Sequence, residues 1–132
     1  MTVVVDASVV VAALVDSEAP GRWAEEVLVS DALAGPHLLL VESANVLRRA
    51  VAAGEISDDI ATLAHGDLVD LRIDLVGYEP FAARVWELRG NLTAYDAWYV
   101  AVAEALDAPL ATLDRRLAGT PGLRCRLISP PS

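Results

Sequence analysis

Short apolar runs alternate with segments of helical pattern along this chain, and that alternation restricts its fold more than any other feature. Residues 3–5, 38–41 and 110–113 form apolar runs that are each followed directly by an acidic residue. Short, continuously apolar runs are typical of strands that are buried on both faces. Strands that alternate with helices predict an α/β fold, with a mostly parallel sheet covered by helices on both faces.

The expected elements follow one another without a linker, a repeat or a low-complexity segment. The expected strands lie at residues 2–6, 37–40, 72–76, 110–113 and 124–128. The expected helices lie at residues 7–15, 23–33, 41–53, 58–70, 80–88 and 94–106, with a short helical turn at 115–118. Pro and Gly predict breaks at 17–21 and 35–36. We therefore expect a single domain over residues 1–132.

Four acidic residues recur at comparable places in this pattern. Asp6, Glu42 and Asp114 each follow an apolar run, and Asp96 lies at the start of the helix expected from residue 94. Ligands of open α/β sheets bind beyond the carboxyl ends of the strands. Carboxylates that converge there repel one another unless a cation lies among them, and Mg²⁺ prefers oxygen ligands. The set therefore predicts a divalent-metal site and favours a metal-dependent nuclease.

Each acid taken alone also has a structural explanation. Asp6 and Asp114 suit the N-cap position of a helix, where a carboxylate accepts hydrogen bonds from free N–H groups. Thr93 and Asp96 have the spacing of a capping box, with Asp in place of the usual Glu or Gln. Glu42 is favoured in a first helical turn by the helix dipole. Only the recurrence of all four favours a shared site.

Three uncharged polar residues accompany the acids. Ser8 and Thr112 each lie two residues from one of the acids, so their hydroxyl groups are expected at the same edge of the sheet. Helix capping and strand propensity explain these two residues equally well. Asn45 lies one helical turn beyond Glu42, and we expect it to orient that carboxylate.

The charge balance excludes some functions and favours others. All ten cationic side chains are Arg, so a P-loop and a haloacid-dehalogenase-type phosphatase, which both need a Lys, are excluded. The net charge of −9 argues against broad electrostatic adhesion to nucleic acid and favours a basic partner. Arg115 and Arg116 directly follow the last acid, which makes one of them a candidate for phosphate contact. Simple surface solvation is the alternative.

The remaining chemistry-bearing residues carry little information. His37 and His65 have no partner at the spacing of metal ligands. Cys125 is the single cysteine, so an intrachain disulfide is excluded and we expect a reducing, cytoplasmic setting. No apolar run reaches the length of about 20 residues that spans a bilayer, so no membrane contact is expected. A secretory signal has a basic segment before its apolar region, and no basic segment precedes the first apolar run here.

Four segments together resemble the PIN domain and, more narrowly, the VapC toxins of bacterial toxin–antitoxin pairs. They lie at residues 3–8 (VVVDAS), 39–49 (LLVESANVLRR), 92–104 (LTAYDAWYVAVAE) and 109–118 (PLATLDRRLA). The resemblance covers essentially the whole chain, in order and with typical spacing. The third segment, in which Tyr-Asp-Ala is followed by an aromatic residue, is its most specific part.

The resemblance implies a three-layer α/β/α sandwich with a parallel sheet. It implies an endoribonuclease that depends on Mg²⁺ or Mn²⁺, with a catalytic quartet that matches Asp6, Glu42, Asp96 and Asp114. It also implies a homodimer, an RNA substrate and inhibition by a cognate VapB antitoxin whose tail enters the acidic groove.

Within that expectation, Asp6, Asp96 and Asp114 are the expected metal ligands, and Glu42 is either a ligand or the general base. One alternative is a catalytically silent PIN-like module that binds a basic, antitoxin-type peptide. Another is a structure-specific DNA nuclease of the same fold, although such relatives usually carry more acids and long insertions.

Overall fold

A five-stranded sheet organises the computed structural model, which describes residues 1–131. The strands are β1 (Thr2–Val5), β2 (Ala32–Pro36), β3 (Ile73–Val76), β4 (Leu110–Ala111) and β5 (Leu127–Ile128). Their order in the sheet is β3-β2-β1-β4-β5, and every neighbouring pair is parallel. β1 therefore occupies the centre of the sheet, as its continuously apolar sequence predicts.

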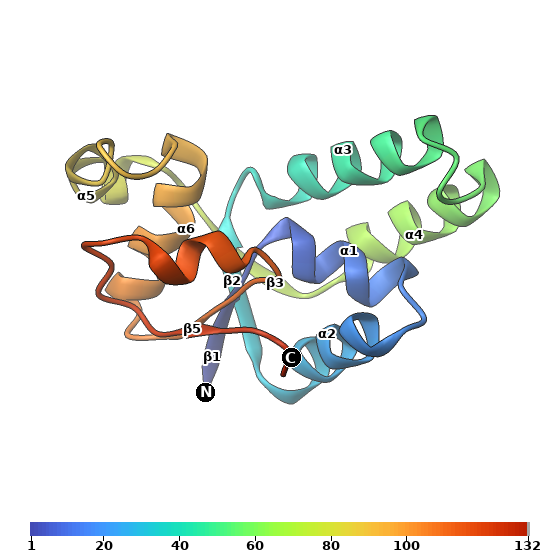
Figure 1. Ribbon diagram of the computed structural model, residues 1–132, viewed down its shortest axis with the longest axis horizontal. Coiled ribbons are helices and arrows are strands. Elements are labelled where there is room, and N and C mark those ends of the chain that lie inside the picture. Colours follow the sequence, from blue (N-terminus) through green and yellow to red (C-terminus); the bar gives the residue numbers. More distant parts are fainter. Residues whose placement is uncertain (132) are drawn as a thin grey trace.

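Helices cover both faces of this sheet. They are α1 (Ala7–Val15), α2 (Ala19–Ser30), α3 (Leu39–Ala52), α4 (Asp58–Asp70), α5 (Ala82–Glu87) and α6 (Ala94–Ala105), with 3₁₀ helices η1 (Glu79–Phe81) and η2 (Arg115–Gly119). In Figure 1, α1 to α4 lie on one side of the strands and α5 and α6 lie on the other. The expected α/β/α sandwich with a parallel sheet is confirmed.

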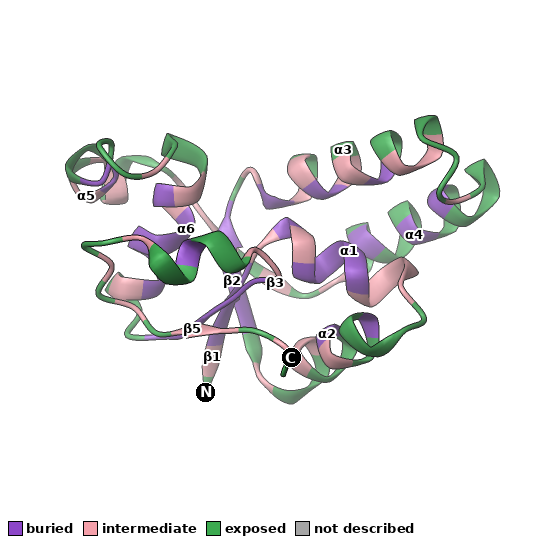
Figure 2. Ribbon diagram, viewed as in Figure 1, coloured by how far each residue is buried: buried purple, intermediate pink, exposed green. Residues whose placement is uncertain are grey.

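The core follows from the burial of the central strand between the two helical layers. Val4 and Val5 of β1 are fully buried, as are Val9 of α1 and Val100 of α6, which pack in the same core cluster. Figure 2 shows this buried band running through the middle of the molecule. Within residues 1–131, none of the helices is long and apolar enough to cross a membrane.

The strand expected at 37–40 is wrong, because β2 lies earlier, at Ala32–Pro36. Its sequence, Ala-Leu-Ala-Gly-Pro, has low strand propensity, and Gly and Pro usually indicate a break. The segment is a strand nevertheless, because it lies between β1 and β3 and pairs with both. A Cβ atom on Gly35 would lie 2.9 Å from Cδ2 of Leu39, so glycine allows the first turn of α3 to pack close to β2.

Most other boundaries lie close to the expected ones. α1 and α4 match the expected ranges, and α3 and α6 match within two residues at each end. The helix expected at 23–33 is α2, which begins earlier, at Ala19, with Pro20 in its first turn. The helix expected at 80–88 is divided into η1 and α5, and β4 and β5 are shorter than expected.

The strand order places a topological switch point between β1 and β4. After β1 the chain adds β2 and β3 on one side and then returns to add β4 on the other side of β1. Such a reversal leaves an opening beyond the carboxyl ends of the two strands, where ligands bind in open α/β folds. Asp6 directly follows β1 and Thr112 directly follows β4, so both lie at this opening.

Candidate active site

Asp6 is the most constrained of the four acids. It is the N-cap of α1, and its Oδ1 accepts a hydrogen bond of 3.2 Å from the backbone N–H of Val9. The hydroxyl groups of Ser8 and Thr112 donate to Oδ1 and Oδ2, respectively. The capping explanation therefore holds for this residue, and the same carboxylate also contacts the end of β4 through Thr112.

The same two hydroxyl groups tie the end of β4 to the end of β1. Ser8 Oγ accepts a hydrogen bond of 3.0 Å from the backbone N–H of Leu113. Thr112 Oγ1 accepts a hydrogen bond of 3.0 Å from the backbone N–H of Asp114. Ser8 and Thr112 thus act as both donors and acceptors, and they fix the segment that carries Asp114 relative to Asp6.

Glu42 lies in the first turn of α3 rather than at the end of a strand. Its Oε1 accepts a hydrogen bond of 2.9 Å from the hydroxyl group of Tyr99, a residue of α6 that is only 4% exposed. Sequence reasoning did not single out Tyr99. The available signal was its spacing, since Tyr99 lies three residues after Asp96 and so shares a face of the same helix.

Asp96 occupies the first turn of α6. Its backbone N–H donates a hydrogen bond of 3.2 Å to Oγ1 of Thr93, which is the N-cap. The reciprocal bond of a capping box, from the backbone N–H of Thr93 to the Asp96 carboxylate, is not formed among the described residues. The Asp96 carboxylate therefore accepts no backbone hydrogen bond from the cap, although the Thr93 side chain lowers its pKa.

Asp114 is the N-cap of η2, and Arg116 holds its carboxylate. Oδ1 of Asp114 accepts hydrogen bonds from the backbone N–H of Arg116 at 3.0 Å and from its Nε at 3.1 Å. Oδ2 of Asp114 accepts a further bond from Nη2 of Arg116 at 3.1 Å. Both carboxylate oxygens are thus engaged by one neighbouring side chain.

Two of the supporting residues lie elsewhere than expected. Asn45 is exposed, and its Oδ1 accepts a hydrogen bond of 2.9 Å from Nε of Arg48, so the amide contacts a cation rather than Glu42. Arg115 directs Nη2 to the carbonyl oxygen of Pro130 at 3.3 Å. Of the two arginines after the last acid, the one that faces the site is therefore Arg116.

The acids share one electrostatic environment. Burial raises the pKa of Asp6, although hydrogen bonds from Ser8 and Thr112 oppose that rise. Burial also raises the pKa of Glu42, with further contributions from the negative charges of Asp96 and Asp6. These couplings place the carboxyl groups of three separate helices within reach of one another's charge.

The last two acids are coupled in the same way but shift in opposite directions. Burial raises the pKa of Asp96, and the charges of Asp114 and Asp6 raise it further. The hydrogen bonds and charge of Arg116 lower the pKa of Asp114. Asp6, Glu42 and Asp96 are therefore hard to ionise together, whereas the charge of Asp114 is already neutralised by Arg116.

Carboxylate oxygens with raised pKa values are suitable ligands for a hard divalent cation, which would relieve their repulsion. Within residues 1–131, no three His, Cys, Asp or Glu side chains are assembled closely enough to hold one ion. Asp114 is held by Arg116 instead, and Asp6 by two hydroxyl groups. The donor chemistry fits Mg²⁺ or Mn²⁺, and binding would have to draw the side chains together.

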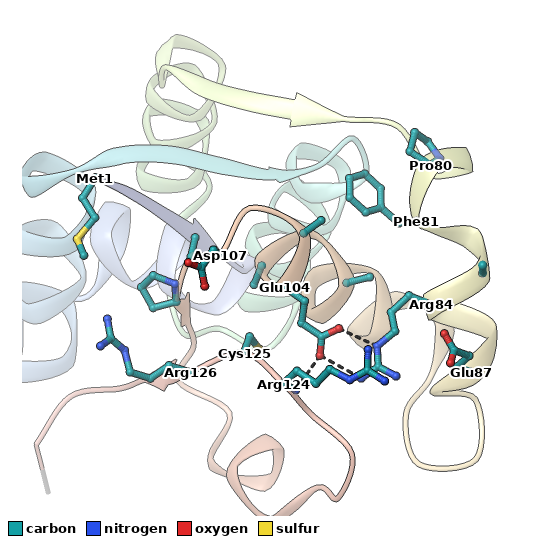
Figure 3. A pocket seen from close by; sticks show the side chains of 16 residues that line it. Met1, Pro80, Phe81, Arg84, Glu87, Glu104, Asp107, Arg124, Cys125 and Arg126 are labelled. Atoms are coloured by element: carbon teal, nitrogen blue, oxygen red, sulfur yellow. Dashed lines mark hydrogen bonds and ion pairs between the residues drawn. The ribbon is translucent and has the colours of Figure 1, made fainter.

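A hollow of about 800 Å³ lies at the edge of the sheet opposite to the four acids, where the strands begin. Its lining includes Met1 and Pro109, which precede β1 and β4, and none of the four acids. Figure 3 shows that Arg84 and Glu104 meet on its wall. Because the carboxylates that could perform hydrolysis lie at the other edge, the size of this hollow does not make it the active site.

Comparisons with known proteins identify the family of the chain. The sequence model of the PIN domain family matches residues 3–123. Ribonuclease VapC1 of Mycobacterium tuberculosis is 43% identical over 125 residues, which cover 94% of each chain. Ribonuclease VapC9 of the same organism is 37% identical over 132 residues, which cover 98% of each chain.

Solved structures share the fold at lower identity. The chain superposes on the sarcin–ricin-loop-cleaving toxin VapC20 of Mycobacterium tuberculosis with a TM-score of 0.66 and 17% identity, over 89% of this chain and 95% of that one. It superposes on VapBC-5 of the same organism with a TM-score of 0.62 and 24% identity, over 97% and 98% of the two chains.

Proposed function

Because the chain belongs to the PIN-domain family and is related to the VapC ribonucleases, we propose that it is a metal-dependent endoribonuclease and the toxin of a toxin–antitoxin pair. The names of its curated relatives support ribonuclease activity. The observation that carries the assignment is that hydrogen bonds join the segments that carry the acids at the switch point of the sheet. Thr112 donates to Asp6 and accepts from the backbone N–H of Asp114, and Tyr99 of α6, the helix of Asp96, donates to Glu42. A separate structural role for each acid does not require hydrogen bonds between these segments.

Asp6, Asp96 and Asp114 are the residues that would hold Mg²⁺ or Mn²⁺. A bound ion of this kind supplies Lewis-acid polarisation of a phosphodiester and neutralises developing negative charge. Glu42 acts either as a further ligand or as the base that accepts the proton of the attacking water. A raised carboxyl pKa suits the role of base, because it brings proton affinity closer to neutral pH.

The hydrogen-bonding side chains around the acids keep the carboxylates in place. Ser8 and Thr112 hold Asp6, so its two oxygens keep one orientation at the opening of the sheet. Tyr99 holds one oxygen of Glu42 and leaves the other without a hydrogen bond among the described residues. Once a metal ion is bound, groups that are oriented in this way would need little further reorganisation during the reaction, which is a principal source of catalytic power.

The proposed partners are an RNA substrate, a VapB-type antitoxin and a second copy of the chain. The net charge of −9 supports an antitoxin with a basic tail. A groove of about 490 Å³ between α3 and α4, with Leu47, Val51 and Ala61 in its lining, supports binding of an apolar segment.

The family match over residues 3–123 supports a single domain. The proposed RNA substrate supports a cytoplasmic location.

Cleavage of RNA by the purified protein tests this assignment. Total RNA is incubated with protein and Mg²⁺ or Mn²⁺, with and without a chelator, and the new RNA ends are sequenced. Asp96→Asn is the sharpest variant, because no backbone N–H depends on that carboxylate in the described chain. We expect metal-dependent cleavage by the wild type and none by the variant, with matching circular dichroism spectra.

Other outcomes identify the alternatives. Binding of a basic peptide without any RNA cleavage would favour the catalytically silent module. Preferential cleavage of flap DNA over RNA would favour a structure-specific DNA nuclease. Equal cleavage by the wild type and Asp96→Asn would remove the four acids as the source of activity.

A further inference from the structure

Arg116 makes an unusual contact for a side chain that is 91% exposed. Its guanidinium group uses two nitrogens, Nε and Nη2, on the two oxygens of Asp114, each at 3.1 Å. This is the forked geometry in which arginine and a carboxylate pair most strongly. Arg116 lies only two positions after Asp114, so the turn that begins η2 brings its guanidinium group against the Asp114 carboxylate.

The charge of Arg116 also reaches a second acid. It lowers the pKa of Asp96 as well as that of Asp114, and both acids in turn raise the pKa of Arg116. The positive charge of Arg116 therefore compensates the negative charges of Asp96 and Asp114. A divalent cation held by the same carboxylates would compete with it for Asp114.

We propose that Arg116 is a displaceable internal counter-ion, which must release Asp114 before this carboxylate can join Asp6 and Asp96 around a divalent ion. This inference rests on the proposed function, since it assumes that these acids hold metal. The exposure of Arg116 makes release easy, because exposed ion pairs contribute little and are screened by salt. Arg116 is thus a positioning residue that sets how readily the metal binds.

The neighbouring Arg115 provides a matched control. Arg115 carries the same charge one position away, but within residues 1–131 its guanidinium contacts the carbonyl oxygen of Pro130 and no acid. Arg115→Gln therefore measures the general effect of removing one positive charge near the site. Arg116→Gln removes the same charge together with the fork on Asp114, while the backbone N–H of residue 116 still caps the turn.

Mn²⁺ binding by the full chain in the absence of RNA provides the test, with free Mn²⁺ measured by electron paramagnetic resonance. We expect Arg116→Gln to bind Mn²⁺ roughly 2–5-fold more tightly than the wild type, the range that corresponds to one exposed ion pair. Arg115→Gln should stay near the wild-type value. Arg116→Lys, which keeps the charge but cannot form the fork, should lie between wild type and Arg116→Gln.

Two results would overturn the inference. Equal affinities of wild type and Arg116→Gln, or equal gains in both Gln variants, would show that Arg116 does not compete for Asp114. These results would leave the proposed function intact, because metal still binds. Failure of every protein, including the wild type, to bind Mn²⁺ would overturn both the inference and the proposed function.

Discussion

The hydroxyl group of Tyr99 donates a hydrogen bond of 2.9 Å to Oε1 of Glu42, although 57 positions separate the two residues in the sequence. Tyr99 belongs to α6 and Glu42 to α3, which lie on opposite sides of the sheet (Figure 1). Burial, with the nearby negative charge of Glu42, raises the pKa of Tyr99, so it remains a protonated donor. The bond therefore joins the two helical layers at the opening that holds the acids.

Tyr99→Phe should slow RNA cleavage and change its pH dependence. The Tyr99 hydroxyl lowers the pKa of Glu42 against the effect of burial, so its loss should raise that pKa further. If ionised Glu42 is the reactive form, the acid limb of the pH–rate profile should move to higher pH. Loss of one hydrogen bond to a charged group should also cost about 1–3 kcal/mol of stability, measured by urea unfolding.

Tyr95→Phe is the matched control for this prediction. Tyr95 lies on the same helix but is 60% exposed, and its hydroxyl group makes no hydrogen bond in the part of the chain that is described. Removing that hydroxyl should leave both the pH profile and the unfolding curve unchanged. An unshifted acid limb in Tyr99→Phe would mean that Glu42 does not control the reaction.

The places of the four acids in the fold were predictable from the sequence, because these residues follow apolar runs or begin helices. The location of β2 was not, since Gly35 and Pro36 disfavour a strand locally and only the neighbouring strands impose one. Glu42 still lies at the expected edge of the sheet despite this error, because α3 begins soon after β2.

Contacts between distant side chains were the least predictable part of the site. Asn45 has a suitable helical spacing from Glu42, yet its amide binds Arg48. The contact that Glu42 does make comes from another layer of the fold, through Tyr99. Spacing within one helix shows which residues share a face, but it does not show which residues other helices bring against that face.

Asp96→Asn should raise the melting temperature of the metal-free protein at neutral pH. The folded-state pKa of Asp96 is raised, so its contribution to stability is full below the ordinary carboxyl pKa and is lost as pH rises through the raised value. The variant removes that penalty, and because the group is partly exposed the gain should be roughly 1–4 °C. Differential scanning calorimetry in the presence of chelator measures it.

The gain should disappear when the calorimetry is repeated at a pH below the ordinary carboxyl pKa, where Asp96 is protonated in both states. Asp67→Asn, at an exposed position of α4, should show no gain at either pH. A lower melting temperature for Asp96→Asn at neutral pH would show that capping, rather than repulsion, dominates at this position.

Glu104→Gln should destabilise the fold without involving the acid set. Glu104 accepts hydrogen bonds of 2.7 Å from Nε of Arg84 and from the backbone N–H of Arg124, and its side chain is only 11% exposed. Burial opposes ionisation, but these donors lower the pKa of Glu104 overall. Its loss should cost about 2–4 kcal/mol at neutral pH, measured by urea unfolding.

The pH dependence of that loss follows from the lowered pKa. Stability contributed by Glu104 is present above the ordinary carboxyl pKa and is lost as pH falls through the lowered folded-state value. The difference between wild type and Glu104→Gln should therefore shrink in acid. Glu25→Gln, an exposed change on α2, should have no effect at any pH, and a constant Glu104→Gln difference would contradict the ion-pair explanation.

Thr112→Val should weaken both the fold and cleavage, since Thr112 links two of the acids while it is only 2% exposed. Its hydroxyl group donates to Asp6 and accepts from the backbone N–H of Asp114. Valine has a similar shape but leaves the partly buried N–H of Asp114 and a carboxylate oxygen of Asp6 without their partner, at a cost of about 1–3 kcal/mol. Urea unfolding and RNA cleavage rates measure the two effects.

Thr112→Ser separates the hydroxyl group from the methyl group. Serine keeps the donor and the acceptor and loses only one buried methyl, so it should recover most of the cleavage rate while losing a little stability. If the valine variant cleaved RNA at the wild-type rate, the orientation of Asp6 by Thr112 would be irrelevant to the reaction. If the serine variant were as slow as the valine variant, packing around Thr112, rather than its hydrogen bonds, would position Asp6.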